Sequence, residues 1–368
     1  MWPLAILVLG GGGPPPTCRT CHRAIVDGFE RTAHRRTSSE AGPGTILGDF
    51  APGHNVLRTR SRGVSFQMEQ RPDGFYQMAR DSAAGGTRAE RMDLVIGSGR
   101  RGQTYLYWSN GLLFELPVSW LTATHQWINS PGYPDGQIDF SRVVVPRCLE
   151  CHATSFAMSS DRRVRRYSST YQLGIGCVKC HGDGRAHVAY QAAHPEDSTA
   201  HDIFNPARAS RDRQVDVCAL CHSGGRELRR PPFSFRPGDS LDAFLDPESA
   251  ASAVPDVHGN QIGLLRRSKC FRASPTLSCI TCHDVHQVQR DVAAFVPHCL
   301  QCHDATQHPG ADSIGTRLTS LCIDCHMPIR KSNALQINTA GRQTGLYFRS
   351  HEIAIYPDIA AALLRSHP

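Results

Sequence analysis

Fourteen of the 15 cysteines fall into seven Cys-x-x-Cys pairs, and a histidine directly follows every pair. Two thiols three positions apart can each add to one vinyl group of a single porphyrin, and the next residue then presents its imidazole to the iron. The pairs that would carry this attachment are Cys18 and Cys21, Cys148 and Cys151, Cys177 and Cys180, Cys218 and Cys221, Cys279 and Cys282, Cys299 and Cys302, and Cys322 and Cys325. The iron ligands beside them would be His22, His152, His181, His222, His283, His303 and His326.

Structural zinc and disulfides are the rival interpretations of paired cysteines. Neither requires a histidine immediately after the second cysteine. Histidine makes up only 19 of the 368 residues, so its presence after all seven pairs is not a chance event. The spacing therefore predicts seven covalently bound haems c.

Twelve histidines remain for the opposite faces of the irons, enough to give every haem two histidine ligands without requiring it. Six have contexts that favour this distal role: His34, His54, His187, His258, His286 and His351. A second group is also available, with a surface position as the simpler alternative: His125, His194, His201, His298 and His308. A haem with two histidines suits electron transfer, whereas an open position allows a substrate to bind.

Cys270 is the one cysteine outside the motifs. The leading interpretation is a buried structural thiol. A thiolate ligand, an intermolecular disulfide and a redox-active thiol are the alternatives.

The net charge of +7 does not indicate a nucleic-acid-binding protein. An oxidised haem with two ionised propionates and two neutral ligands carries a charge of about −1, so seven haems offset the excess. Arginine side chains suit such propionates because their planar donors match a carboxylate.

The segment 1–17 begins with ten mostly apolar residues. These are too few to span a bilayer, because a transmembrane helix needs about 20 residues. It is interpreted as a signal-like or anchor segment, although it lacks a basic start and a clear cleavage site. As an anchor it would associate with a membrane. Export to the periplasm or the cell exterior is predicted mainly from the cofactor, because haem is attached to such motifs after export.

The motifs are unevenly spaced, and this spacing suggests the domain organisation. We expect a first haem-binding segment at 18–60, a β-rich insert at 61–140, a six-haem core at 141–330 and a tail at 331–368 that carries His351. Alternating apolar residues predict strands at 64–68 and 75–78 around a turn, and at 93–96, 104–108 and 112–116. The predicted fold class is mainly α and irregular, built around haems, with a small antiparallel β insert.

Several motifs resemble those of the multihaem c-type cytochromes related to the tetrahaem cytochrome of ammonia oxidisers. That group extends to hydroxylamine oxidoreductase and to proteins with doubled Cys-x-x-Cys-His units. The matching segments are 176–184 with His187, Asn205-Pro206-Ala207-Arg208 and 322–328. The resemblance covers mainly 141–330 and the first motif with His34. It implies that a distal histidine ligates a haem other than the nearest one in sequence, so His187 and His286 would join neighbouring haems.

The sequence departs from the catalytic members of this group. It contains no Cys-x-x-Cys-Lys motif, which marks the active haem of pentahaem nitrite reductases. No feature identifies the tyrosine-crosslinked haem of hydroxylamine oxidoreductase.

Three functions are consistent with the sequence. The leading hypothesis is an electron carrier that relays electrons between redox partner proteins, rather than an enzyme. The second is an oxidoreductase that acts on a small nitrogen or sulfur compound at one five-coordinate haem. The third, disfavoured by about 53 residues per haem, is a subunit of an extracellular cytochrome filament.

Overall fold

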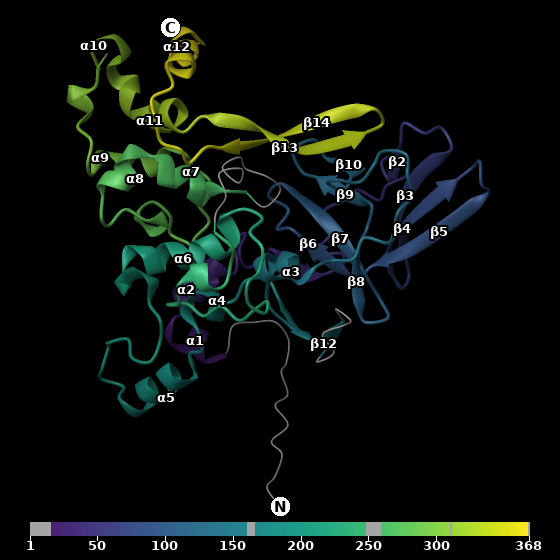
Figure 1. Ribbon diagram of the computed structural model, residues 1–368, viewed down its shortest axis with the longest axis horizontal. Coiled ribbons are helices and arrows are strands. Elements are labelled where there is room, and N and C mark those ends of the chain that lie inside the picture. Colours follow the sequence, from purple (N-terminus) through teal and green to yellow (C-terminus); the bar gives the residue numbers. More distant parts are fainter. Residues whose placement is uncertain (1–15, 160–165, 248–258, 310, 367–368) are drawn as a thin grey trace, which may run out of the picture.

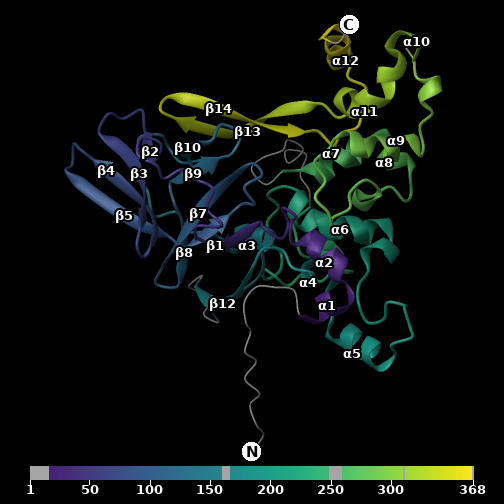
Figure 2. The ribbon, with the colours of Figure 1, turned by 180° about the vertical axis from the view of Figure 1, so that it is seen from behind.

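The computed structural model describes residues 16–159, 166–247, 259–309 and 311–366. Figure 1 shows a β-rich region beside a region of short helices, and Figure 2 shows the same arrangement from behind. The signal-like segment lies almost entirely outside the described residues, as does His258. Within the described residues, no helix is long and apolar enough to cross a membrane.

Ten strands between residues 38 and 129 form two antiparallel sheets. One sheet has four strands in the order β2-β3-β4-β5, and the other has six in the order β1-β6-β7-β9-β10, with β8 paired to β7. The strands are β1 (Ser38–Glu40), β2 (Val56–Arg58), β3 (Val64–Arg71), β4 (Gly74–Asp81), β5 (Gly86–Met92), β6 (Leu94–Ile96), β7 (Gly102–Ser109), β8 (Leu112–Glu115), β9 (Val118–Leu121) and β10 (Gln126–Asn129).

Alternating apolar residues drive the two sheets together. Over the first six residues of β3 and of β4, every second residue is buried, because successive side chains of a strand point to opposite faces. Phe66 and Met68 from one sheet share a core with Tyr105, Trp120 and Trp127 from the other. The predicted strands at 64–68, 75–78, 93–96, 104–108 and 112–116 are therefore confirmed.

A buried glutamine connects the two sheets. The Gln77 side chain donates to the carbonyl of Val118 at 2.6 Å and accepts from its N–H at 3.0 Å. Both groups of the amide are satisfied, so its burial carries no unpaired polar atom.

The helical region is made of short segments joined by turns. Its helices are α1 (Pro16–Cys21), α2 (Arg23–Phe29), α3 (Pro146–His152), α4 (Val178–His181), α5 (Arg185–Ala193), α6 (Arg211–His222), α7 (Gln261–Arg267), α8 (Lys269–Ala273), α9 (Val296–Leu300), α10 (Ala311–Ile314), α11 (Leu318–His326) and α12 (Pro357–Ser366). Single 3-10 turns cover Pro206–Arg208, Leu241–Ala243, Cys279–Thr281, Ala293–Phe295, Ala305–Gln307 and Gly315–Arg317.

The second motif packs against the six-stranded sheet. Leu149, inside that motif on α3, packs with Leu94, Leu106 and Leu113. The hairpin of β11 (Ala153–Met158) and β12 (Tyr167–Leu173) follows α3 directly and adds Phe156 to the same core. This core fixes the position of the second motif against the β-rich region.

A second hairpin, β13 (Ile329–Thr339) and β14 (Arg342–Arg349), runs from the helical region over β9 and β10 (Figure 1). Thr339 Oγ1 accepts from the N–H of Asn129 at 3.0 Å, and the N–H of Gly341 donates to Asp135 at 2.9 Å. Ile337 packs with Ile128 of β10. The predicted tail therefore joins the two regions.

The predicted fold class was wrong. Helices make up 30% and strands 27% of the structure, so it is not mainly α. The helical share is small because a haem motif needs only about one turn of helix. The strand share is larger than expected because the sequence analysis did not predict the short strands β1, β2, β9 and β10, which have only three or four residues each. It also did not predict the hairpins beyond residue 141.

Candidate haem sites

One helical turn builds the motifs. The backbone N–H groups of His22, His181, His283 and His303 donate to the carbonyl of the first cysteine of their own motifs, at 2.8 to 3.0 Å. This i to i−4 bond places residues i, i+3 and i+4 on one side of the turn. Both thiols and the imidazole of such a motif therefore face the same space.

Five motif histidines face a second histidine ring across a gap of nearly constant width. The ring centroids are 6.1 to 6.4 Å apart in the pairs His22 and His187, His34 and His222, His181 and His286, His283 and His351, and His308 and His326. In each pair the second histidine comes from a segment that follows a different motif. His187, for example, follows the third motif and faces the histidine of the first.

This gap fits a metal ion held by both rings. A five-membered ring with bonds of about 1.33 Å has a radius of about 1.1 Å, and a metal–imidazole bond is about 2.0 Å long. Two such bonds in line place the ring centroids about 6.3 Å apart. The five observed separations agree with this value, so these residues fit a haem iron between them.

Hydrogen bonds on the far sides of the rings orient the same histidines. The Nδ1 atoms of His181, His187 and His326 lie 3.0, 2.9 and 2.9 Å from the carbonyls of Phe204, His201 and Ala354. A ring that donates from Nδ1 keeps the lone pair of Nε2 free for a metal.

Burial keeps several of these imidazoles neutral. Burial lowers the pKa of His222 to about 4, and the neighbouring His34 adds to this shift. Burial, with His283 nearby, also lowers the pKa of His351 to about 4. The pKa values of His34, His181 and His283 are lowered for the same main reason. The neutral form is the one that ligates a metal, so no proton has to be displaced at neutral pH.

Apolar side chains beside the motifs are exposed to a degree unusual for their type. Val178 of the third motif, Val288, Val292 and Leu300 of the sixth motif are 36 to 44% exposed. Apolar porphyrins in these places would cover such surfaces.

The structure places the other expected ligands differently. His54 is exposed in the β-rich region, where its Nδ1 lies 2.7 Å from a carboxylate oxygen of Asp49, and its ring faces no motif histidine. The Nδ1 of His152 lies 2.9 Å from Thr37 Oγ1, which orients the second motif. His303 is exposed, and no imidazole in the described ranges stacks across from it.

His308 belongs to the second group of candidates, for which the sequence analysis gave a surface position as the simpler alternative. It lies five positions after the sixth motif, and its ring faces His326 of the seventh. Asp304 caps the short 3-10 turn that carries it, by accepting from the N–H of Thr306 at 2.9 Å. Such a capped turn is common in loops, so the sequence held no specific signal for this role.

Cysteines of different motifs lie next to one another. The thiols interact directly in the pairs Cys18 and Cys177, Cys151 and Cys221, and Cys218 and Cys279. Electrostatic neighbours at longer range are Cys180 and Cys218, Cys282 and Cys299, and Cys299 and Cys322. Because each cysteine would carry the edge of a porphyrin, these neighbours would bring the haems of different motifs close together.

Cys270 is half-buried and lies within electrostatic reach of Cys282 and Cys299. It therefore sits near the fifth and sixth motifs. The interpretation as a structural thiol stays a prediction.

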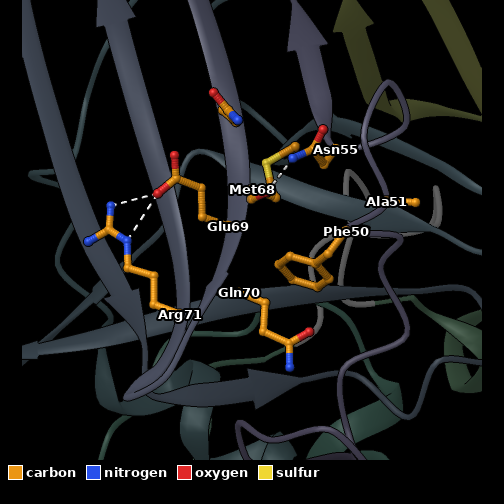
Figure 3. A pocket seen from close by; sticks show the side chains of 8 residues that line it. Phe50, Ala51, Asn55, Met68, Glu69, Gln70 and Arg71 are labelled. Atoms are coloured by element: carbon orange, nitrogen blue, oxygen red, sulfur yellow. Dashed lines mark hydrogen bonds and ion pairs between the residues drawn. The ribbon is translucent and has the colours of Figure 1, made fainter.

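Two hollows of about 490 and 500 Å³ lie away from the motifs. One, of about 500 Å³, lies in the β-rich region and is lined by Phe50, Met68 and Arg71 among others. Figure 3 shows Arg71 paired with Glu69 there, at 2.7 to 3.0 Å, and Asn55 donating to the Met68 carbonyl. It contains no motif residue. In the described residues, no three histidine, cysteine or acidic side chains gather as ligands for a bare metal ion.

Comparisons with known proteins agree with the haem chemistry. Residues 129–182 match the family of cytochrome c554 and c-prime. The chain is 24% identical over 229 residues to the C-type polyheme cytochrome OmcC of Geobacter sulfurreducens, a match that covers 52% of this chain and 28% of that protein. The chain therefore spans less than a third of that relative's length.

One solved structure has a similar fold, and a second matches less closely. The outer cell wall cytochrome OcwA superposes with a TM-score of 0.60 at 15% identity, over 95% of this chain and 81% of that one. An undecaheme cytochrome from the S-layer of Carboxydothermus ferrireducens gives a TM-score of 0.43 at 13% identity, over 96% and 59% of the two chains.

The motifs and the paired imidazoles thus agree with the similarity of the chain to multihaem c-type cytochromes. Its cofactor is covalently bound haem c. Proteins of this class transfer electrons.

Proposed function

We propose that this protein is an exported seven-haem cytochrome that relays electrons between redox partner proteins through closely spaced bis-histidine haems. When bound, such haems supply one-electron chemistry at low potential. The chain supplies their spacing, their ligands and their burial.

The observation that carries the proposal is the set of five opposed histidine pairs at 6.1 to 6.4 Å. A ring on each face of an iron fills both axial positions and leaves no place for a substrate. The proposed distal ligands are thus His187, His34, His286, His351 and His308 for the first, fourth, third, fifth and seventh motifs. His258 stays a sequence prediction as a distal ligand, and no distal ligand is proposed for the second motif.

The neighbouring cysteines support an order for the haems. Contacts join the first motif to the third and the fourth motif to the fifth. Weaker neighbours join the third to the fourth, the fifth to the sixth and the sixth to the seventh. We infer a main path in this order, with the second haem joining at the fourth through Cys151 and Cys221. The same exchange of ligands between motifs supports kinship with the group that includes hydroxylamine oxidoreductase.

A haem count combined with a redox titration tests this function. The mature full chain should contain seven haems by the pyridine haemochrome method, and all should be reduced and reoxidised without a bound substrate. Fewer haems, or a haem that changes only in the presence of a small substrate, would contradict the relay.

One observation favours a second function, an oxidoreductase that acts on a small nitrogen or sulfur compound. His303 is exposed and faces no described imidazole, so the sixth iron would have an open position. Cyanide should then bind one haem per molecule and remove a high-spin signal. If the protein binds no cyanide, the oxidoreductase function is excluded and the electron relay is the function that remains.

Export supports the same proposal. Haem c is attached after export, and the similar structures come from an outer cell wall and an S-layer by their names. We therefore place the protein in the periplasm or outside the cell. Association with a membrane through segment 1–17 stays a prediction.

A further inference from the structure

A half-buried cation lies where three haem motifs meet. Lys179 stands between the two cysteines of the third motif, and its ammonium is within electrostatic reach of Cys221, Glu150, Cys151 and Cys180. These neighbours belong to the fourth, second and third motifs. Burial lowers the pKa of Lys179, while the charge of Glu150 opposes the shift.

The carboxylate nearest to this lysine is already engaged by other groups. Glu150 is 1% exposed, accepts from the N–H of Phe233 at 2.8 Å and pairs with Arg147 at 3.1 Å. Arg147 also donates to the sulfur of Cys151 at 3.2 Å and to the carbonyl of Leu220 at 2.7 Å. Two cations and one anion leave the junction with a net charge of +1.

An aromatic ring holds the ammonium in place. The Lys179 nitrogen lies 4.7 Å from the centre of the Phe233 ring, a distance at which the ring face attracts a cation. Phe233 has φ +61, in the left-handed region that a phenylalanine rarely adopts. The hydrogen bond from its N–H to Glu150 stabilises this conformation, in which the ring lies against the Lys179 ammonium.

Porphyrin propionates cannot readily neutralise this charge. The cysteines around Lys179 would bind the vinyl-bearing edges of three haems, and the propionates of a porphyrin are at the edge opposite its vinyl groups. Reduction adds one negative charge to a haem, so a fixed positive charge nearby favours the reduced form.

We propose that Lys179 raises the reduction potentials of the haems at this junction. An electron would then reside preferentially on these haems, where the second haem joins the main path. This inference rests on the proposed function and on the haem order given above. Lys179 ligates no iron and acts on the haems only through the charge of its ammonium group.

A redox titration of the full haem-loaded chain, followed by electron paramagnetic resonance, tests this role. The imidazole planes are nearly perpendicular in only two of the five pairs, His34 with His222 at 78° and His308 with His326 at 73°. Perpendicular planes bring the iron d orbitals close in energy and give a large-gmax signal that separates from the others. Only the first of these pairs lies at the junction.

Lys179→Met should shift the oxidised-to-reduced ratio at the junction haem about tenfold, which is about 59 mV to lower potential for a one-electron couple. The second large-gmax signal should keep its midpoint. Lys179→Arg should restore the junction potential, and Lys331→Met, on the exposed face of β13, should change neither.

Three results would overturn the inference: an unchanged junction midpoint, equal shifts of both signals, or the same shift in Lys179→Arg. If Lys179→Met does not mature with its full haem content, Lys179→Gln is compared in the same way. Absence of both large-gmax signals from the unaltered protein would instead refute the proposed ligation. In that case the optical titration of Lys179→Met against Lys179→Arg still decides the role of the charge.

Discussion

Replacing His34 by glycine removes one proposed distal ligand and nothing else from the fourth haem site. The ring of His34 faces His222 at 6.1 Å, whereas its backbone carbonyl accepts from the N–H of Ile175 at 3.0 Å. Glycine keeps this backbone bond and leaves a space the size of an imidazole. The haem would stay attached through Cys218 and Cys221.

The expected change follows from the count of sites. His34→Gly should convert one of seven haems from low spin to high spin. It should also remove one of the two large-gmax signals, since only two of the paired rings are nearly perpendicular. The remaining large-gmax signal should belong to His308 and His326.

Electron paramagnetic resonance of the oxidised protein, integrated against a haem count, measures both changes. Free imidazole should enter the vacated space and restore the low-spin signal. His54→Gly is the matched control, because His54 is exposed and paired only with Asp49. The reasoning is refuted if His34→Gly keeps both large-gmax signals, or if His54→Gly creates a high-spin haem.

Three further outcomes are expected. Phe66 is only 1% exposed, so Phe66→Ala should lower the free energy of unfolding of the β-rich region by about 3–5 kcal/mol. Denaturant melts followed by circular dichroism measure this loss. Val56 lies at the surface, so Val56→Ala should lower the free energy of unfolding by far less. Equal losses would contradict the packing described. Gly174→Ala should weaken the His34 signal, because a Cβ there would collide with the Arg35 carbonyl, whereas at Gly182, which has a similar positive φ of +75, a Cβ meets no atom within 4 Å. An intact signal in Gly174→Ala would argue against this coupling. Cyanide titration should saturate at one equivalent if the sixth iron is open, and a spectrum unchanged by cyanide would exclude that site.

The local chemistry could be predicted from the sequence, because each attachment site is complete within five consecutive residues. One turn of helix suffices to bring two thiols and an imidazole together, as in the turn that ends at His181. No tertiary contact is needed to recognise it.

Distal ligands are harder to predict than attachment sites, because each histidine pair joins segments far apart in the chain. In the structure the rings of His34, His187, His286 and His351, four of the six expected distal ligands, face motif histidines, whereas His54 lies in the β-rich region. His308 faces His326, although its sequence context is that of an ordinary loop. Ligand identity depends on the packing of distant turns, and no local pattern records it.

The β content exceeded the prediction for a similar reason. The strands around residues 64–81 alternate strongly and were recognised, because one face is buried against the second sheet. The strand β9 is buried at all four positions and has no alternation to detect. The hairpin of β13 and β14 owes its position to contacts with Asn129 and Asp135, more than 200 residues away.

Quantitative electron paramagnetic resonance of the oxidised, fully loaded protein tests the central claim most directly. The proposed ligation predicts seven haems by chemical count, with two large-gmax signals from the perpendicular pairs and at least three ordinary low-spin signals from the pairs at 15°, 15° and 27°. Predominantly high-spin iron, or a spectrum without large-gmax signals, would contradict a relay built on these histidine pairs.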